Sequence, residues 1–165
     1  MGFTLDYPNE LWDVGVSGSQ IGEDFRAALG FVPRRGIRKI RSFVTFQPRA
    51  PEIGMRRFIF EFLPVVFTDL EGRLLDYRIF TAPMHFVTES QERIEFNVIP
   101  EFQRLDEVFE IHPGVIIPPG DYKWTRYRAE ISTANRRPWV AELSDWWGSF
   151  FSGNRIESNS RSASR

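Results

Sequence analysis

The chain has 165 residues, and its 21 basic and 22 acidic side chains leave a formal net charge of -1. This length is enough for one ordinary domain with a core, and the balanced charge excludes a bulk electrostatic field that would attract nucleic acid, so no nucleic-acid partner is expected. The absence of cysteine excludes disulfides, cysteine-ligated zinc and thiol nucleophiles.

Membrane and export signals of the common kinds are missing from the sequence. No apolar run approaches the roughly 20 residues that a spanning helix needs. The first residues, MGFTLDYPNE, lack the basic start and the apolar stretch of a secretory signal. If the protein is exported, its leader is expected to lie outside this chain.

Aromatic residues make up 15% of the chain, which favours strands because flat rings pack well on a pleated surface. Near the beginning, Trp12, Val14 and Val16 alternate with polar or small residues and predict a first strand. A second strand is predicted from Ile40 to Gln47.

The densest basic run extends from Arg34 and Arg35 to Arg41, and it predicts a turn that enters this second strand. At the rim of a membrane protein, the guanidinium groups of such arginines can donate paired hydrogen bonds to the phosphates of lipids. The alternative is a solvated cationic turn whose charge is balanced by Glu23 and Asp24. The candidate loop or rim contacts in this part of the chain are Glu23, Asp24, Arg34 and Arg35.

A hairpin is predicted from about Arg56 to Val87. Its first strand places Phe58, Phe60 and Phe62 on one face. The acidic and glycine residues of 68–72 are typical of a turn. On the return strand, the apolar positions in phase are Leu75, Tyr77 and Ile79.

Three further strands with the same period follow the hairpin. They cover 93–102, 124–131 and 139–143. Polar turns are predicted at 88–92 and 135–138. The count is therefore about eight strands in an all-β antiparallel meander, connected without helical crossovers. Residues 1–151 would form this unit, and the Ser/Arg-rich residues 152–165 predict a disordered tail.

A proline-rich stretch, FEIHPGVIIPPGDYKW, connects two of these strands. Prolines cannot donate to a strand ladder, so this stretch predicts a stiff structured loop that interrupts pairing. Its polar and aromatic side chains are candidate contacts for a ligand: Glu110, His112, Asp121 and Trp124. The alternative is a rigid turn that only fixes strand register.

Two architectures fit a period-two meander: a soluble barrel or sandwich with its apolar face inward, and a membrane barrel with its apolar face toward lipid. The polar face carries charges of both signs that could pair across strands in a wet lumen, including Arg57, Glu61, Asp76, Arg78, Arg93, Glu95, Arg126, Arg128 and Glu130. Aromatics near predicted strand ends, at Phe80, Trp139, Trp146 and Trp147, fit a membrane interface.

Two long motifs, IGEDFRAALGFVPRRG (21–36) and FEIHPGVIIPPGDY (109–122), resemble those of a bacterial outer-membrane β-barrel family of unknown function. In that family the barrel follows an N-terminal domain similar to family-nine carbohydrate-binding modules. The resemblance extends from about Tyr7 to Asn154. It implies a small or partial up-and-down outer-membrane-type β-barrel, located in the bacterial outer membrane, with lipid as its partner and glycans bound through a domain outside this chain.

The same resemblance implies that this chain is an interior or C-terminal portion of a larger barrel. Outer-membrane barrels usually finish on a strand with a terminal aromatic residue, whereas this chain finishes Ser162-Ala163-Ser164-Arg165. The chain is therefore not expected to close a barrel alone.

No catalytic constellation is visible. The two histidines, His85 and His112, have no second nitrogen or sulfur ligand nearby in sequence, so neither a metal site nor a cofactor is predicted. Glycosidase chemistry, the basis of an envelope hydrolase, needs two carboxylates at a fixed separation. Carboxylates in predicted loops are Glu23 with Asp24, and Asp106 with Glu107 and Glu110; the alternative is that they are solvated acids of turns. The main expectation is a non-catalytic barrel segment, a membrane anchor or pore wall.

The rival is a soluble β-barrel or sandwich that binds sugars or small ligands. Sugar rings would stack on tryptophans, for which the candidates are Trp12, Trp124, Trp146 and Trp147.

Overall fold

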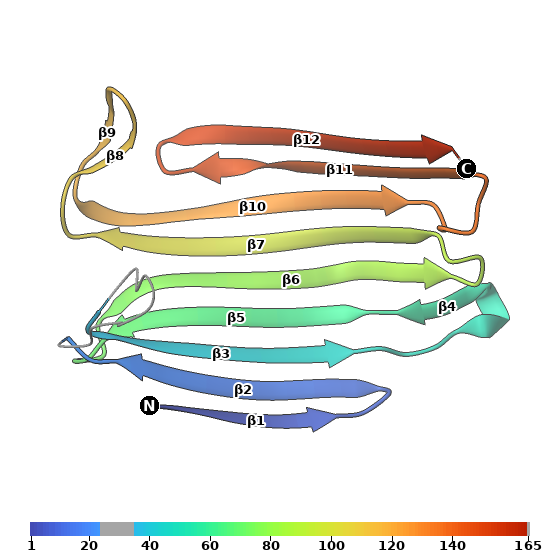
Figure 1. Ribbon diagram of the computed structural model, residues 1–165, viewed down its shortest axis with the longest axis horizontal. Helices are drawn as coiled ribbons and strands as arrows, with labels where there is room; N and C mark the ends of the chain where they lie inside the picture. The colour runs from blue at the N-terminus through green and yellow to red at the C-terminus, as the bar shows by residue number, and fades with distance from the viewer. Residues whose placement is uncertain (24–34, 165) are drawn as a thin grey trace.

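The computed structural model describes residues 1–23 and 35–164, and this part of the chain is an all-β antiparallel meander whose strands lie side by side (Figure 1). The predicted fold class is confirmed. The elements are β1 (Gly2–Pro8), β2 (Trp12–Ile21), β3 (Ile37–Phe46), the 3₁₀ turn η1 (Pro51–Ile53), β4 (Met55–Phe58), β5 (Phe60–Asp69), β6 (Leu74–Thr88), β7 (Arg93–Leu105), β8 (Phe109–His112), β9 (Val115–Ile117), β10 (Gly120–Ser132), β11 (Trp139–Phe150) and β12 (Gly153–Ser164).

The main sheet has the order β1-β2-β3-β5-β6-β7-β10-β11-β12, so chain neighbours are almost always sheet neighbours. β4 pairs with the end of β6, in line with β5, and β8 pairs only with β9. The sheet is not closed: in the described part of the chain, β1 pairs only with β2 and β12 only with β11. Within the described residues, no helix is long and apolar enough to cross a membrane.

The predicted hairpin and turns are confirmed. β5 and β6 are joined at 70–73, where Gly72 has φ of 91°, a left-handed conformation that favours glycine. The β6–β7 connection is 89–92 and the β10–β11 connection is 133–138. Short polar connections therefore make adjacent strands antiparallel, as the sequence predicted.

The proline-rich stretch does interrupt pairing, but it also forms a hairpin of its own. β8 and β9 turn at Pro113 and Gly114, and Gly114 has φ of 82°. Pro118 and Pro119 follow β9 directly and precede the first residue of β10. The hairpin projects from one end of the main sheet (Figure 1).

The predicted disordered tail is wrong. Residues Gly153–Ser164 form β12, which pairs along its whole length with β11. Strand pairing uses backbone groups, so a serine-rich segment with few apolar residues can still complete a ladder beside an existing strand. This strand, together with β1 and the short β4, β8 and β9, raises the count in the described part of the chain to twelve rather than about eight.

The cross-strand register defines two faces, because directly opposed residues of paired strands project to the same side. One side, the charged face, carries Lys39, Arg41, Glu61, Arg78, His85, Arg93, Glu95, Asn97, Glu101, Arg126, Arg128 and Glu130. The other side, the apolar face, carries Phe3, Leu5, Tyr7, Trp12, Val14, Val16, Ile40, Val44, Phe46, Phe60, Phe62, Val66, Tyr77, Phe86, Ile94, Phe96, Val98, Phe102, Tyr127, Ile131, Leu143 and Trp147.

Most of the buried residues lie on the charged face, including the apolar Ile99 and Ala82, whereas on the apolar face Phe102 is buried and many other rings are exposed, which is the reverse of burial in a soluble sheet. Asn97 and Glu95, on the charged face, are 0% and 2% exposed, whereas Phe62 on the apolar face is 48% exposed. Of the four aromatics expected near strand ends, only Trp139 lies at one, as the first residue of β11. Phe80 lies in the middle of β6, opposite Leu63, on the charged face, and Trp146 and Trp147 lie inside β11, with Trp146 on the charged face.

Candidate functional site

A charged network occupies the middle of the charged face, on β7 and β10. The Glu95 carboxylate accepts hydrogen bonds from Arg93 and from Asn97 Nδ2, the latter at 2.9 Å. Arg128 is paired with Glu130, and its Nη1 lies 3.5 Å from Glu95 Oε2. The buried carboxylates are therefore compensated by guanidinium groups of the same and the neighbouring strand.

The network continues toward both sides of the sheet. Arg78 Nε on β6 lies 3.2 Å from Glu101 Oε1 on β7, and Arg126 Nη2 on β10 lies 3.4 Å from Glu157 Oε1 on β12. The prediction that the charged rows pair across strands is confirmed for these residues.

His85 joins the network through an irregularity in β6. The register of β6 against β7 shifts between Thr81 and Met84, with Pro83 at the shift. Because side chains alternate with a period of two, one extra residue moves His85 from the apolar to the charged face, opposite Glu95. Sequence reasoning missed this placement, although a proline inside a strand pattern is a signal of such a bulge.

The charged face therefore brings together Glu61, His85 and Glu95, each of which offers one ligand atom within 4.8 Å of the others. His85 Nδ1 lies 3.4 Å from Glu61 Oε2. His85 Nε2 is buried and has no hydrogen-bond partner among the described residues. A hollow of about 630 Å³ lies beside this group, with His85, Arg93 and Glu130 in its wall.

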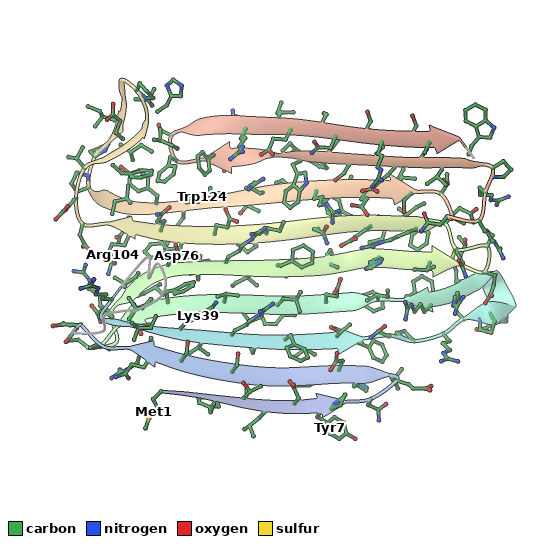
Figure 2. All side chains as sticks on the ribbon, viewed as in Figure 1. Met1, Tyr7, Lys39, Asp76, Arg104 and Trp124 are labelled. Atoms are coloured by element: carbon green, nitrogen blue, oxygen red, sulfur yellow. The ribbon has the colours of Figure 1, made fainter. Side chains whose placement is uncertain are left out.

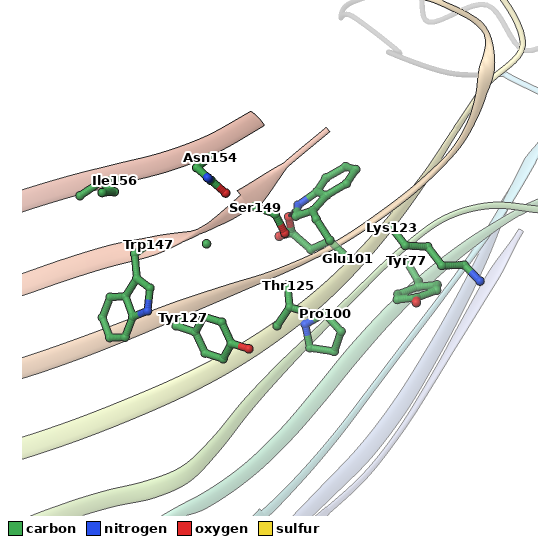
Figure 3. Close-up of a pocket in the computed structure, with 12 residues that line it drawn as sticks. Tyr77, Pro100, Glu101, Lys123, Thr125, Tyr127, Trp147, Ser149, Asn154 and Ile156 are labelled. Atoms are coloured by element: carbon green, nitrogen blue, oxygen red, sulfur yellow. Dashed lines mark hydrogen bonds between the residues drawn. The ribbon is translucent and has the colours of Figure 1, made fainter. Parts of the chain in front are cut away.

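On the apolar face, a second hollow of about 800 Å³ is lined by aromatic and small residues of β6, β7, β10, β11 and β12. Figure 3 shows Tyr127 and Trp147 next to each other on one side of the sheet; their ring centroids are 6.0 Å apart. Lys123 lies toward the end of the hollow near the β8–β9 hairpin and approaches the Phe102 ring at 5.9 Å. The hollow is a shallow, largely apolar surface whose wall also contains one cation, Lys123, and one carboxylate, Glu101.

An aromatic row follows one end of the apolar face. Trp12 and Phe46 have ring centroids 4.4 Å apart, and Phe46 and Phe60 are 6.1 Å apart. The row continues from Phe60 to Phe58 at 6.4 Å and from Phe58 to Phe86 at 6.2 Å. These rings come from β2, β3, β5, β4 and β6, so the row crosses consecutive strands near their ends.

Two candidate contacts, Asp24 and Arg34, lie outside the described residues. Glu23 follows β2 and lies close to Gly36, at the start of β3, and Arg35 is exposed in the same connection. Glu23 and Arg35 therefore belong to the β2–β3 connection.

Glu110 and His112 belong to the β8–β9 hairpin. Glu110 accepts a hydrogen bond from the backbone N–H of Gly114 at 2.9 Å, which fixes the hairpin turn. His112 is exposed, and its Nδ1 lies 3.3 Å from the backbone oxygen of Pro113. The contacts of both side chains are with their own hairpin.

Asp121 and Trp124 lie on opposite faces of β10. Asp121 forms a bidentate pair with Arg104, with N–O distances of 2.6 and 2.7 Å, at the end of the sheet where the hairpin projects (Figure 2). Trp124 is buried on the charged face and donates its indole N–H to Glu101. The candidate contacts that the structure describes are therefore not gathered into one site.

The tryptophans proposed as sugar platforms are also divided between the faces. Trp12 and Trp147 lie on the apolar face, whereas Trp124 and Trp146 lie on the charged face. Arg126 lies over the Trp146 ring at 4.8 Å. The four rings do not form a common stacking platform.

Comparisons of the chain with models of known protein families, with curated protein sequences and with solved structures give no match. The resemblance to an outer-membrane barrel family therefore stays a prediction.

Proposed function

We propose that this chain forms part of the wall of an outer-membrane β-barrel, with its apolar face toward lipid hydrocarbon and its charged face toward an aqueous interior. The observation that carries the proposal is the reversed burial of the two faces. Glu95 and Asn97 are almost completely buried on the charged face, whereas Phe62 and Ile40 are about half exposed on the apolar face. Membrane barrels have this inside-out pattern, with lipid-facing and lumen-facing residues alternating along each strand.

A soluble role fits this arrangement less well. A sheet in water buries its apolar face against a second layer, and each Å² of apolar surface left exposed forgoes about 25 cal/mol. In the described part of the chain, the only other sheet is the two-stranded β8–β9 hairpin at one end of the main sheet. Exposed apolar side chains on the same face of several adjacent strands are typical of a membrane or partner interface.

The aromatic row supports the same orientation. Rings at the ends of consecutive strands form girdles where a barrel wall meets the polar headgroup region. Trp12, Phe46, Phe60, Phe58 and Phe86 occupy such positions on the apolar face. The backbone groups of the inner strands are paired within the sheet, as the interior of a bilayer requires.

The role is that of a wall segment, an anchor or a pore lining, rather than of a complete barrel. In residues 1–23 and 35–164, the main order contains nine strands in alternating direction, so β1 and β12 run the same way and would meet as a parallel pair. Bacterial barrels close with an even number of antiparallel strands. Closure therefore needs at least one further strand. A link to glycans rests on the family resemblance alone.

The test uses two adjacent positions in the middle of β3, Ile40 on the apolar face and Arg41 on the charged face, both exposed. The chain has no cysteine, so Ile40→Cys and Arg41→Cys can each be labelled with one fluorophore. After reconstitution into lipid vesicles, a doxyl-lipid quencher should reduce the fluorescence of the Ile40→Cys label severalfold more than that of the Arg41→Cys label. Aqueous iodide should give the opposite order.

The two variants are matched controls, because they differ by one residue in sequence and by the face they occupy. Equal quenching of both labels by iodide, together with a monodisperse protein in the aqueous fraction without detergent, would contradict the membrane orientation.

A further inference from the structure

We propose that Glu61, His85 and Glu95 form a binding site for a first-row divalent cation, with Zn²⁺ the best-suited ion, on the charged face. Two carboxylates and one imidazole are a ligand set that such ions accept, with water in the remaining position. The site lies on β5, β6 and β7, three adjacent strands of the main sheet. Metal binding at these residues goes beyond the proposed wall function and does not depend on it.

The spacing of the ligand atoms suits an ion after a small closure. Tetrahedral Zn²⁺ with bonds of about 2.1 Å holds neighbouring ligand atoms about 3.4 Å apart. His85 Nδ1 and Glu61 Oε2 are already 3.4 Å apart. All three ligand atoms lie within 4.8 Å of one another, so Glu95 needs to move by about 1 Å or a little more.

An independent observation, the state of the imidazole, points to a ligand. His85 is only 6% exposed, and no described residue forms a hydrogen bond with its Nε2. Buried polar groups in native proteins are almost always paired, and an orphaned one carries a desolvation cost. Its Nδ1, the nitrogen that faces Glu61, makes only this long contact of 3.4 Å, so the buried imidazole has no strong partner among the described residues and Nδ1 is open to a cation.

The surroundings supply an outer shell and an entry path. Asn97 Nδ2 donates to Glu95 Oε1 at 2.9 Å and so orients the carboxylate. Arg93 also pairs with Glu95. Its Nε has no hydrogen-bond partner among the described residues but lies 3.9 Å from Glu130 Oε1, so this carboxylate can take over the pairing when an ion binds the Glu95 oxygen. The hollow of about 630 Å³ beside His85 gives solvent access.

The charge balance also allows a cation. Around His85 and the hollow beside it, the four carboxylates of Glu61, Glu95, Glu130 and Glu142 outnumber the three guanidinium groups of Arg57, Arg93 and Arg128. A divalent ion thus enters a region with one excess negative charge when the imidazole is neutral.

The experiment is a Zn²⁺ titration of the protein labelled with ¹⁵N-histidine, in the medium in which it folds. The chain has only two histidines, so the spectrum contains two imidazoles. His112→Asn, in the exposed β8–β9 hairpin, assigns the remaining signal to His85 without disturbing the sheet. We expect one Zn²⁺ per chain, a change in the His85 signal, and no change in affinity in His112→Asn.

Ligand variants complete the test. Glu61→Gln keeps the shape of the side chain and should reduce the Zn²⁺ affinity by more than about tenfold, because the amide is a poor ligand. His85→Asn should abolish the stoichiometric binding. If that variant does not fold, Glu61→Gln still decides. The proposal is overturned if the His85 signal does not move below millimolar Zn²⁺, if only the His112 signal moves, or if Glu61→Gln binds as tightly as the parent protein.

Discussion

Replacing Glu95 by Ala tests whether the buried network stabilises the sheet. Glu95 is 2% exposed and is paired with Arg93, with Asn97 and, at 3.5 Å, with Arg128. Removing one partner of a buried ion pair costs about 3–5 kcal/mol because the remaining charges are left uncompensated. Both arginines keep Glu130, at 3.9 Å from Arg93 and in direct contact with Arg128, so the loss should lie at the lower end, about 3 kcal/mol.

The matched control is Glu142→Ala, which removes an exposed carboxylate from the same face, on β11. Such a surface change should stay within about 0.5 kcal/mol. The free energies of unfolding are obtained from urea titrations of the protein in detergent micelles, followed by tryptophan fluorescence, with a chelator present. If Glu95→Ala is no more destabilising than Glu142→Ala, the network is solvated and its burial has no energetic consequence.

Two other substitutions have expected outcomes that the same titrations can check. Hydrogen bonds from Ser90, and next from Arg137, lower the pKa of Glu92 from 4.5 to about 2. The ionised carboxylate therefore stabilises the folded protein fully above about pH 4.5, and this contribution is lost as the pH falls toward 2. The parent protein should lose stability relative to Glu92→Gln across that window, and parallel pH profiles would contradict this. Gly148→Ala should lower the free energy of unfolding by about 1–3 kcal/mol, because Gly148 has φ of 140° and a Cβ there would lie 2.3 Å from a backbone oxygen. The control Gly153→Ala should be nearly neutral, because its Cβ would meet no atom closer than 3.8 Å. Equal losses of stability in the two variants would refute the strain at Gly148.

The alternation of residues was enough to predict the two faces. In β7, Glu95 and Asn97 lie on one side and Phe96 and Val98 on the other, as the period of two requires. What alternation leaves open is which face is buried, because a soluble sheet and a membrane wall have the same pattern. Burial depends on long-range pairing, so it could be recognised only once the strands were in place.

The candidate metal site depends on register, which the sequence pattern does not specify. His85 meets Glu61 and Glu95 only because the β6 ladder shifts by one residue near Pro83. Glu110 and His112, which were candidates because they lie in the proline-rich stretch, instead contact only the backbone of their own hairpin in the interactions described above. Nearness in sequence was a poor guide here, since cross-strand neighbours in a long meander are separated by a whole strand and a turn.

The two ends of the sheet differ on the apolar face, and this difference gives a last prediction. β1 carries Phe3, Leu5 and Tyr7, each more than half exposed, whereas the corresponding positions of β12 include Ser158, Ser160 and Ser162. Serine hydroxyls are poorly solvated by hydrocarbon. Protein or water is therefore expected to cover β12, while lipid contacts β1.

In vesicles, a label on Phe3→Cys should be quenched by doxyl lipid more strongly than a label on Ser160→Cys. Equal quenching at the two positions would mean that β12 faces hydrocarbon despite its hydroxyls, and the apolar band would then extend across the whole sheet.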